Sequence, residues 1–110
     1  FLEDVSEAPY RIDRLLTHLL LSKKLDRVRG IVFGQMTDCE PTPHTANVDV
    51  WRAIRYALED FLKERKIPTI CNFPAGHGNP QITFPIGTKV ELLAHAEKPS
   101  VRFLEAGVRE

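Results

Sequence analysis

Hydrophobic residues recur with helical spacing near the start of the chain. They occur at i, i+3, i+4, i+7 and i+8, which places them on one face of a helix: Ile12, Leu15, Leu16, Leu19 and Leu20. Pro9 suits the first turn of this helix, because its fixed φ is already helical and its missing N–H is not needed there. Lys23 and Lys24 suit its C-terminal end, where cations are stabilised. The pattern therefore predicts an amphipathic helix from residue 9 to about residue 23.

A second helical pattern lies in the middle of the chain, over residues 48–66. The residues expected on its buried face are Val50, Ile54, Ala57, Leu58 and Phe61. The segment closes with "KERK", whose cations again favour a helix C-terminus. A polar loop with two prolines, residues 38–49, is expected to lead into this helix.

Short apolar runs bounded by turn residues predict strands around these helices. The expected strands are residues 30–37, 67–73, 81–87, 88–96 and 101–107. The first two are continuous apolar runs, typical of strands covered on both faces. In residues 88–96, Val90 and Leu92 alternate with Lys89 and Glu91, as in a half-exposed strand. Helices alternating with strands, followed by antiparallel strands, predict an α/β fold with a small mixed sheet.

Composition adds limits to this picture. A chain of 110 residues suits one domain, and its 15 basic and 15 acidic residues give no excess that favours nucleic acid. No apolar run approaches the roughly 18 residues that a membrane span requires. Two cysteines make no disulfide framework, so a reduced, cytosolic setting is expected. The chain lacks an initiating Met and opens on "FLED", like a strand entering a loop, so a piece of a larger protein is expected.

The sequence favours neither a metal site nor a phosphate-binding loop. Cys39, His44, Cys71 and His77 carry atoms that zinc accepts, but they lack the close pairs of structural zinc sites, and no metal is expected. Cys71 is instead expected to pack as a small apolar residue at a strand end. The glycines of "AGHGNP" lead toward a strand, whereas phosphate-binding loops lead into a helix.

General acid–base chemistry is the third candidate, and it centres on His77. Gly76 and Gly78 flank this histidine, so other groups can approach it closely. An imidazole titrates near neutrality, and a carboxylate on its other nitrogen stabilises the charged form. Glu3 or Asp4 could supply that carboxylate, because parallel sheets gather strand ends at one edge.

The alternative to acid–base chemistry is purely structural. His77 could be a solvated loop residue, and the two acids could simply favour the positive end of the first helix. A nucleophile is also missing, because none of Ser6, Ser22 and Ser100 lies in a G-x-S-x-G turn. The residues alone leave these two interpretations open.

Several ordered motifs resemble one known family. They are "LED" at residues 2–4, "EAPYRIDR" at 7–14, "GH" at 76–77 and "TFPIG" at 83–87. Together, over nearly all of the 110 residues, they resemble the C-terminal half of the LD-carboxypeptidase family of serine peptidases. Residues 1–110 would then form the C-terminal domain, similar to the swivelling β/β/α domains, without the N-terminal nucleophile domain.

The resemblance implies a Ser-Glu-His triad that is split between two domains. Glu3 would be the acid, His77 the base, and the serine would come from the N-terminal domain, so that this chain alone should be inactive. The implied protein is a bacterial, cytoplasmic, homodimeric hydrolase that needs no cofactor. Its substrate would be the murein tetrapeptide, from which it removes the terminal D-alanine during peptidoglycan recycling. The resemblance assigns no substrate-binding role to Arg11 or Arg14.

Two rival functions remain beside this interpretation. One is a microcin C immunity-type peptidase, which has the same triad but cleaves peptidyl-nucleotide conjugates. The other is a non-catalytic domain that keeps the fold for binding or dimerisation. The "EAPYRIDR" helix start favours the murein enzymes over the first rival, and the presence of both acid and base argues against the second.

Overall fold

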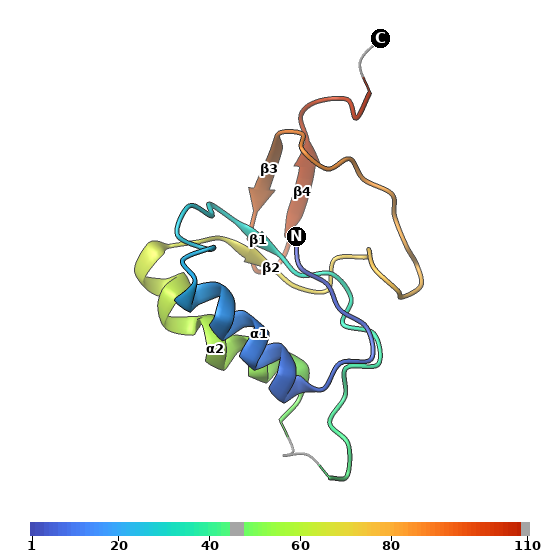
Figure 1. Ribbon diagram of the computed structural model, residues 1–110. Coiled ribbons are helices and arrows are strands. Elements are labelled where there is room, and N and C mark those ends of the chain that lie inside the picture. Colours follow the sequence, from blue (N-terminus) through green and yellow to red (C-terminus); the bar gives the residue numbers. More distant parts are fainter. Residues whose placement is uncertain (45–47, 109–110) are drawn as a thin grey trace.

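The computed structural model describes residues 1–44 and 48–108 of the chain (Figure 1). Residues 45–47, which belong to the predicted polar loop, lie outside the described residues. The elements, in order, are α1 (Pro9–Leu21), β1 (Ile31–Val32), α2 (Val50–Arg65), β2 (Thr69–Ile70), β3 (Val90–Leu93) and β4 (Ser100–Phe103). None of the described helices is long and apolar enough to cross a membrane.

Both predicted helices are present, with slightly shorter bounds. Helix α1 starts at Pro9 as expected, but it ends at Leu21, because the chain turns at Lys23 into a left-handed conformation with φ 58°. Helix α2 starts after Asp49, whose side chain accepts a hydrogen bond of 3.0 Å from the backbone N–H of Arg52. Such a side-chain cap satisfies one of the free donors at the helix start.

The main core lies between the two helices and the parallel strands (Figure 1). Helices α1 and α2 pack side by side. The buried residues that form the core are Ile12, Leu16, Leu25, Ile31, Phe33, Cys39, Val50, Ile54, Leu58 and Ile67. Leu15, expected on the buried stripe of α1, is about half exposed instead. It sits at the border of the stripe, where the neighbouring helix does not cover it.

Strands β1 and β2 are parallel, and isolated bridges extend their pairing at both sides. Ile31 pairs with Thr69 and Val32 with Ile70. Further parallel bridges join Leu2 to Phe33, Val5 to Thr37, and Gln35 to Gly76. The chain segments 2–5, 31–37 and 69–76 therefore run side by side, with 31–37 in the middle.

Strands β3 and β4 form a separate antiparallel hairpin that rises from this body (Figure 1). The α/β class with small sheets is confirmed, with the parallel and antiparallel pairings in two sheets. The predicted strand at 81–87 is wrong: this segment is an extended loop whose Ile82 N–H donates to the Pro74 carbonyl. Pro85 has no N–H to give to a strand ladder.

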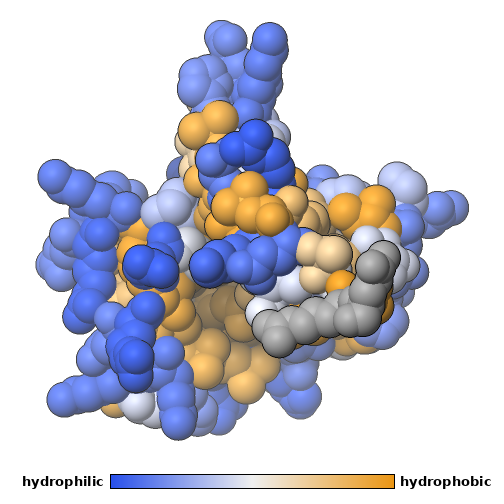
Figure 2. Space-filling view, turned by 90° about the horizontal axis from the view of Figure 1, so that it is seen from above, coloured by the Kyte–Doolittle hydropathy of each residue, from blue (hydrophilic) through white to orange (hydrophobic). Residues whose placement is uncertain are grey.

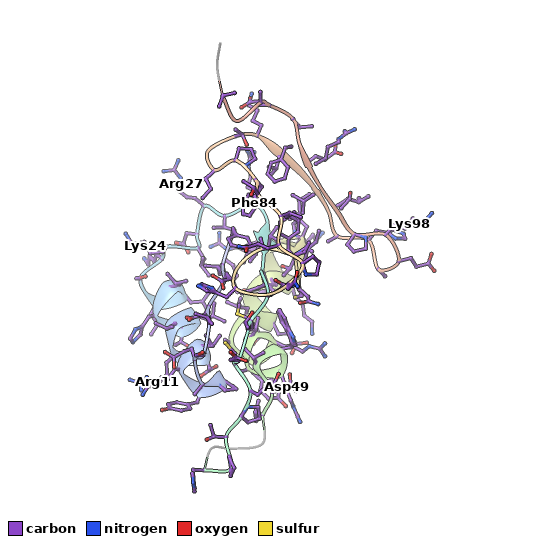
Figure 3. All side chains as sticks on the ribbon, turned by 90° about the vertical axis from the view of Figure 1, so that its right-hand side faces the viewer. Arg11, Lys24, Arg27, Asp49, Phe84 and Lys98 are labelled. Carbon is purple, nitrogen blue, oxygen red and sulfur yellow. The ribbon has the colours of Figure 1, made fainter. Side chains whose placement is uncertain are left out.

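An aromatic cluster of Phe1, Phe73, Phe84 and Phe103 joins the hairpin to the parallel strands. Phe84 touches the other three rings, with centroid distances of 5.1 Å to Phe1, 5.7 Å to Phe73 and 5.8 Å to Phe103. Figure 3 shows Phe84 between the helices and the hairpin. Seen from above, hydrophobic residues gather toward the middle of the face, with some hydrophilic residues lying across them and more around them (Figure 2). The hairpin is therefore joined to the body through this cluster and through Leu92, which packs against Gly30.

Candidate functional site

The three parallel segments bring Glu3 and His77 to one edge of the sheet. The Leu2 N–H donates to the Val32 carbonyl at 2.9 Å, and the Gly34 N–H donates to the Leu2 carbonyl at 2.8 Å. This pairing fixes Glu3 beside Gly34. On the other side of the middle segment, the Gln35 N–H donates to the Ala75 carbonyl at 3.1 Å, just before the histidine loop.

Glu3 and His77 touch through their side chains. The Oε1 atom of Glu3 lies 2.7 Å from the Nδ1 atom of His77, although the residues are 74 apart in sequence. The Glu3 side chain is 16% exposed, whereas that of His77 is 58% exposed. The structure thus brings the two predicted residues together, with the carboxylate sheltered and the imidazole open to solvent.

This contact fixes the roles of the two ring nitrogens. A carboxylate oxygen accepts, so Nδ1 carries the proton in the pair. In a neutral ring the other nitrogen, Nε2, is then unprotonated and free to accept one. None of the described residues hydrogen-bonds to Nε2. Chemically, this arrangement can serve as a general base: the Glu3 carboxylate sets the tautomer of the ring, and Nε2 of His77 is left to accept a proton.

The backbone around His77 is held by the neighbouring loop. Gly76 has φ +126°, a conformation that L side chains rarely adopt. The carbonyl of Gly76 accepts a hydrogen bond of 2.5 Å from Nε2 of Gln81. The side chain of Gln35 packs closely against Gly78. Gly76 is therefore required by its backbone conformation, and Gly78 by the close approach of the Gln35 side chain. The two glycines and the contact with Gln81 define the conformation of the turn that carries His77.

Asp4, the other candidate acid, faces away from the histidine. Its Oδ1 atom accepts from the N–H of Val5 at 2.8 Å. Its carbonyl lies 3.8 Å from the thiol of Cys39. Adjacent residues of an extended segment point to opposite sides, so only one of the two acids can reach His77.

The other candidate residues lie apart from this pair. Arg11, on α1, forms an ion pair of 3.5 Å with Glu7, which lies just before the helix. Together with Arg14, it lines a separate hollow of about 280 Å³. Ser22 donates to the Leu19 carbonyl at 3.2 Å, and none of the described serines hydrogen-bonds to His77. A larger hollow of about 780 Å³ lies beside the aromatic cluster, and neither Glu3 nor His77 lines it.

The four metal-ligand candidates do not converge. Within residues 1–44 and 48–108, no three His, Cys, Asp or Glu side chains are placed to hold a metal ion. Cys39 is buried in the main core, and desolvation raises the pKa of its thiol. Cys71 is exposed, so the prediction that it packs at a strand end is wrong: it follows β2 at the open edge of the sheet.

Two residues of the site were not singled out from the sequence. Gly34 lies beneath the Glu3 side chain, and Gln35 supports the turn after His77. The signal for Gly34 was a glycine directly after the buried run Ile31–Phe33, where a packed side chain would be the norm. Gln35 carried no comparable signal, because its contact with Gly78 depends on the tertiary fold.

Comparisons with known proteins agree with this fold. A Bacillus subtilis protein named "Probable murein peptide carboxypeptidase" is 36% identical over 110 residues, which is 100% of this chain and 32% of the relative. The murein tetrapeptide carboxypeptidase of Pseudomonas aeruginosa is 29% identical over 86 residues, covering 78% of this chain and 26% of that protein. The chain thus spans about a third or less of the length of these relatives.

Solved structures and a family description complete the comparison. The muramoyltetrapeptide carboxypeptidase of Oxalobacter formigenes superposes with a TM-score of 0.75 and 25% identity, covering 92% of this chain and 34% of the other. A microcin C7 self-immunity protein has the same fold, with a TM-score of 0.74 and 22% identity over 97% of this chain and 30% of its own. Residues 1–92 match the family described as the LD-carboxypeptidase C-terminal domain. With most of its length matched, this chain belongs to the LD-carboxypeptidase C-terminal domain family.

Proposed function

We propose that residues 1–110 are the C-terminal domain of a serine-type LD-carboxypeptidase, with Glu3 and His77 as two members of a Ser-Glu-His triad. The serine would come from an N-terminal domain of the same protein. The observation that carries the proposal is the 2.7 Å contact between Glu3 Oε1 and His77 Nδ1 on an otherwise exposed imidazole.

In the proposed reaction, Nε2 of His77 is the group that moves protons. It takes the proton of the serine hydroxyl as the serine oxygen attacks the carbonyl carbon of the scissile peptide bond. It then gives that proton to the leaving nitrogen, so that the amine departs and an acyl-enzyme remains. The same nitrogen then takes a proton from a water molecule as the water oxygen attacks the ester carbonyl carbon, and it gives that proton to the serine oxygen as the ester C–O bond breaks.

Glu3 acts on His77 rather than on the substrate. Its carboxylate accepts from Nδ1–H, which keeps Nε2 unprotonated and correctly aimed in the resting state. When Nε2 becomes protonated, the imidazolium stays beside the carboxylate, whose negative charge stabilises it. The low exposure of Glu3, 16%, strengthens this effect because solvent screens the pair less on that side.

The substrate that we propose is the murein tetrapeptide, cleaved before its terminal D-alanine in the cytoplasm during peptidoglycan recycling. The names of the relatives from Bacillus, Pseudomonas and Oxalobacter support this class of substrate. We also propose that the full-length protein is a homodimer that needs no cofactor. The 110-residue chain, without a nucleophile, should not hydrolyse the tetrapeptide.

The test is alanine substitution of the base in the full-length protein. His77→Ala should lower kcat by roughly 10⁶-fold and Glu3→Gln by roughly 10⁴-fold, as in other triads, with little change in thermal stability. His18→Ala is the matched control, since His18 is exposed on α1. Release of D-alanine from murein tetrapeptide at normal rates by the His77→Ala variant would refute the assignment.

A microcin C immunity-type peptidase is the second candidate. The observation that favours it is 28% identity over 94 residues to the Escherichia coli microcin C7 self-immunity protein, covering 84% of this chain and 25% of that protein. Both candidates use the same triad, so substitutions of Glu3 and His77 do not separate them. Comparing kcat/KM of the full-length protein on murein tetrapeptide and on a peptidyl-nucleotide conjugate does, because the preferred substrate identifies the candidate.

A further inference from the structure

Glu3 and His77 come from segments that are not neighbours in the sheet. Segment 31–37 runs between them, with Leu2 paired to Phe33 on one side and Gly76 paired to Gln35 on the other. Adjacent strands lie about 4.8 Å apart, so the two outer segments are separated by roughly twice that distance. The Glu3 side chain must therefore cross over the middle segment to reach the imidazole.

The crossing takes place at Gly34. A Cβ atom at this residue would lie 3.0 Å from Cγ of Glu3, 2.8 Å from the ring of Phe1 and 2.6 Å from the carbonyl oxygen of Ala75. Separations below 3.0 Å are essentially never seen for real Cβ atoms. A side chain at residue 34 would thus collide with the Ala75 carbonyl oxygen and the Phe1 ring, and it would press on Cγ of Glu3, which must then shift and carry the carboxylate with it.

A second glycine continues the same path on the far side. A Cβ atom at Gly76 would lie 2.5 Å from Cγ and 2.6 Å from Oε1 of Glu3. The carboxylate therefore passes over two consecutive positions that have no side chain, one on each of the neighbouring segments. Only beyond Gly76 does it meet His77.

We propose that Gly34 is a positioning residue for the acid–base pair: its missing side chain leaves the channel through which Glu3 reaches Nδ1 of His77. The inference rests on the proposed function, because it concerns the same pair. It adds a residue that touches neither substrate nor the reacting nitrogen, and that acts only through the place of the Glu3 carboxylate.

A simpler role for Gly34 is close packing of the strands, since the Ala75 carbonyl is also within 2.6 Å of the missing Cβ. The two roles differ in what they predict for residue 3. If the space beside Gly34 serves the Glu3 side chain, then a shorter side chain at residue 3 should reduce the loss of stability caused by a methyl group at residue 34. If it serves strand packing, residue 3 makes no difference.

The experiment uses the full-length protein with Gly34→Ala, and Gly30→Ala as the matched control. Gly30 lies just before β1, and a Cβ atom there would meet only the flexible tip of Leu92 below 3.0 Å. Gly34→Ala should lower kcat for murein tetrapeptide by roughly 10²-fold, the usual cost of misplacing a catalytic group by about 1 Å. KM should change little, and Gly30→Ala should leave both constants near their normal values.

Two further readouts are specific to positioning. The ¹⁵N chemical shifts of the His77 ring should show a partial loss of the Nδ1–H tautomer in Gly34→Ala, in the same direction as in Glu3→Gln but smaller. Adding Glu3→Gln to Gly34→Ala should lower kcat much less than Glu3→Gln does alone, because the two changes remove the same contact. An unchanged tautomer, or fully additive losses of kcat, would overturn the proposal.

Failure of the proposed function looks different. If His77→Ala and Glu3→Gln leave hydrolysis intact, the catalytic assignment falls, yet the tautomer shift in Gly34→Ala still tests the channel. If those two variants are inactive while Gly34→Ala behaves like Gly30→Ala in both kcat and tautomer, the catalytic assignment stands and the channel falls.

A variant that does not fold is also informative. When Gly34→Ala lowers the melting temperature, the loss should be clearly smaller in a Glu3→Ala background, because the smaller side chain vacates the channel. If Gly34→Ala unfolds the protein and the double variant folds, the proposal is supported. If the melting temperature falls equally in both backgrounds, or both stay unfolded, Gly34 serves strand packing against Ala75 and the proposal is wrong.

Discussion

The helical body and the β3–β4 hairpin are held together in different ways. In the body, Phe33 and Leu58 are 0% exposed, and the helices and parallel strands share one continuous core. In the hairpin, Val90 is 46% and Leu93 54% exposed, and the link to the body is an aromatic cluster. The body is thus held by a continuous buried core, whereas the hairpin is held by ring contacts and by the packing of Leu92 against Gly30.

The candidate site belongs to the body, but the loop that carries His77 also touches the aromatic cluster. Glu3 is fixed by the strand pairing of Leu2 with the middle segment of the body. His77 lies on the loop between Phe73 and Phe84, both of which belong to the aromatic cluster. Glu3 is therefore placed by strand pairing, whereas the histidine loop is placed both by the pairing of Gly76 with Gln35 and by ring packing, and the predictions below separate these contributions.

The largest effect on stability is expected in the body. Leu58→Ala should lower the free energy of unfolding by about 2–5 kcal/mol, because it leaves a cavity at a fully buried residue. Urea denaturation followed by the fluorescence of Trp51, whose ring packs against Phe33, measures this loss. Leu21→Ala, at a leucine that is 76% exposed, is the control and should change stability by less than about 0.5 kcal/mol. Equal losses of unfolding free energy in Leu58→Ala and Leu21→Ala would contradict the idea that the buried core stabilises the body.

A smaller effect is expected at the junction of the two regions. Phe84→Ala should cost about 2 kcal/mol, below the ~3–5 kcal/mol of a fully buried phenylalanine, because Phe84 is only partly covered. Amide hydrogen exchange should rise in β3, in β4 and in the loop around His77, while the helices stay protected. Phe84→Leu, which keeps most of the volume, should show a milder change. Uniform exchange across the whole chain would show that the hairpin and body unfold as one unit.

The smallest effect is expected on the outer face of the hairpin. Arg102 and Glu91 face each other across β3 and β4 at 2.9 Å, with side chains 66% and 54% exposed. Such exposed pairs contribute little, so Arg102→Ala should lower the free energy of unfolding by less than about 0.5 kcal/mol. Urea denaturation at low and high salt checks this value, since salt screens an exposed pair. A loss of unfolding free energy above about 1 kcal/mol would show that the Arg102–Glu91 pair stabilises the hairpin more than an exposed ion pair usually does.

The sequence predicted the body well because its periodicity is set by burial. Helices α1 and α2 follow from apolar stripes. The start of α1 follows from a proline at its first position, and that of α2 from the side-chain cap of Asp49. The strand predicted at 81–87 is absent. Ile82 and Phe84 are residue types that favour strands, but Phe84 packs against other aromatic rings and the Ile82 N–H donates to a loop carbonyl instead of a neighbouring strand. A short apolar run therefore does not show whether a segment pairs as a strand or packs as a loop.

The candidate site was predictable only in part. His77 stood out because of its glycine neighbours, and the family resemblance selected Glu3 over Asp4. The contribution of Gly34 depends on three segments meeting in one place, and no local pattern encodes such a meeting. Spacing along the chain carries little information about residues that face each other across a sheet.

The order of the strands has a consequence for how the protein acquires its site. Segment 2–5 is synthesised before its pairing partner, segment 31–37, and before His77. Joining residues 74 apart in sequence closes a long loop, and the entropy cost of that closure must be offset by contacts made on folding. The acid–base pair therefore depends on the pairing of segment 2–5 with segment 31–37, and local opening of segment 2–5 should separate Glu3 from His77 while both helices remain folded.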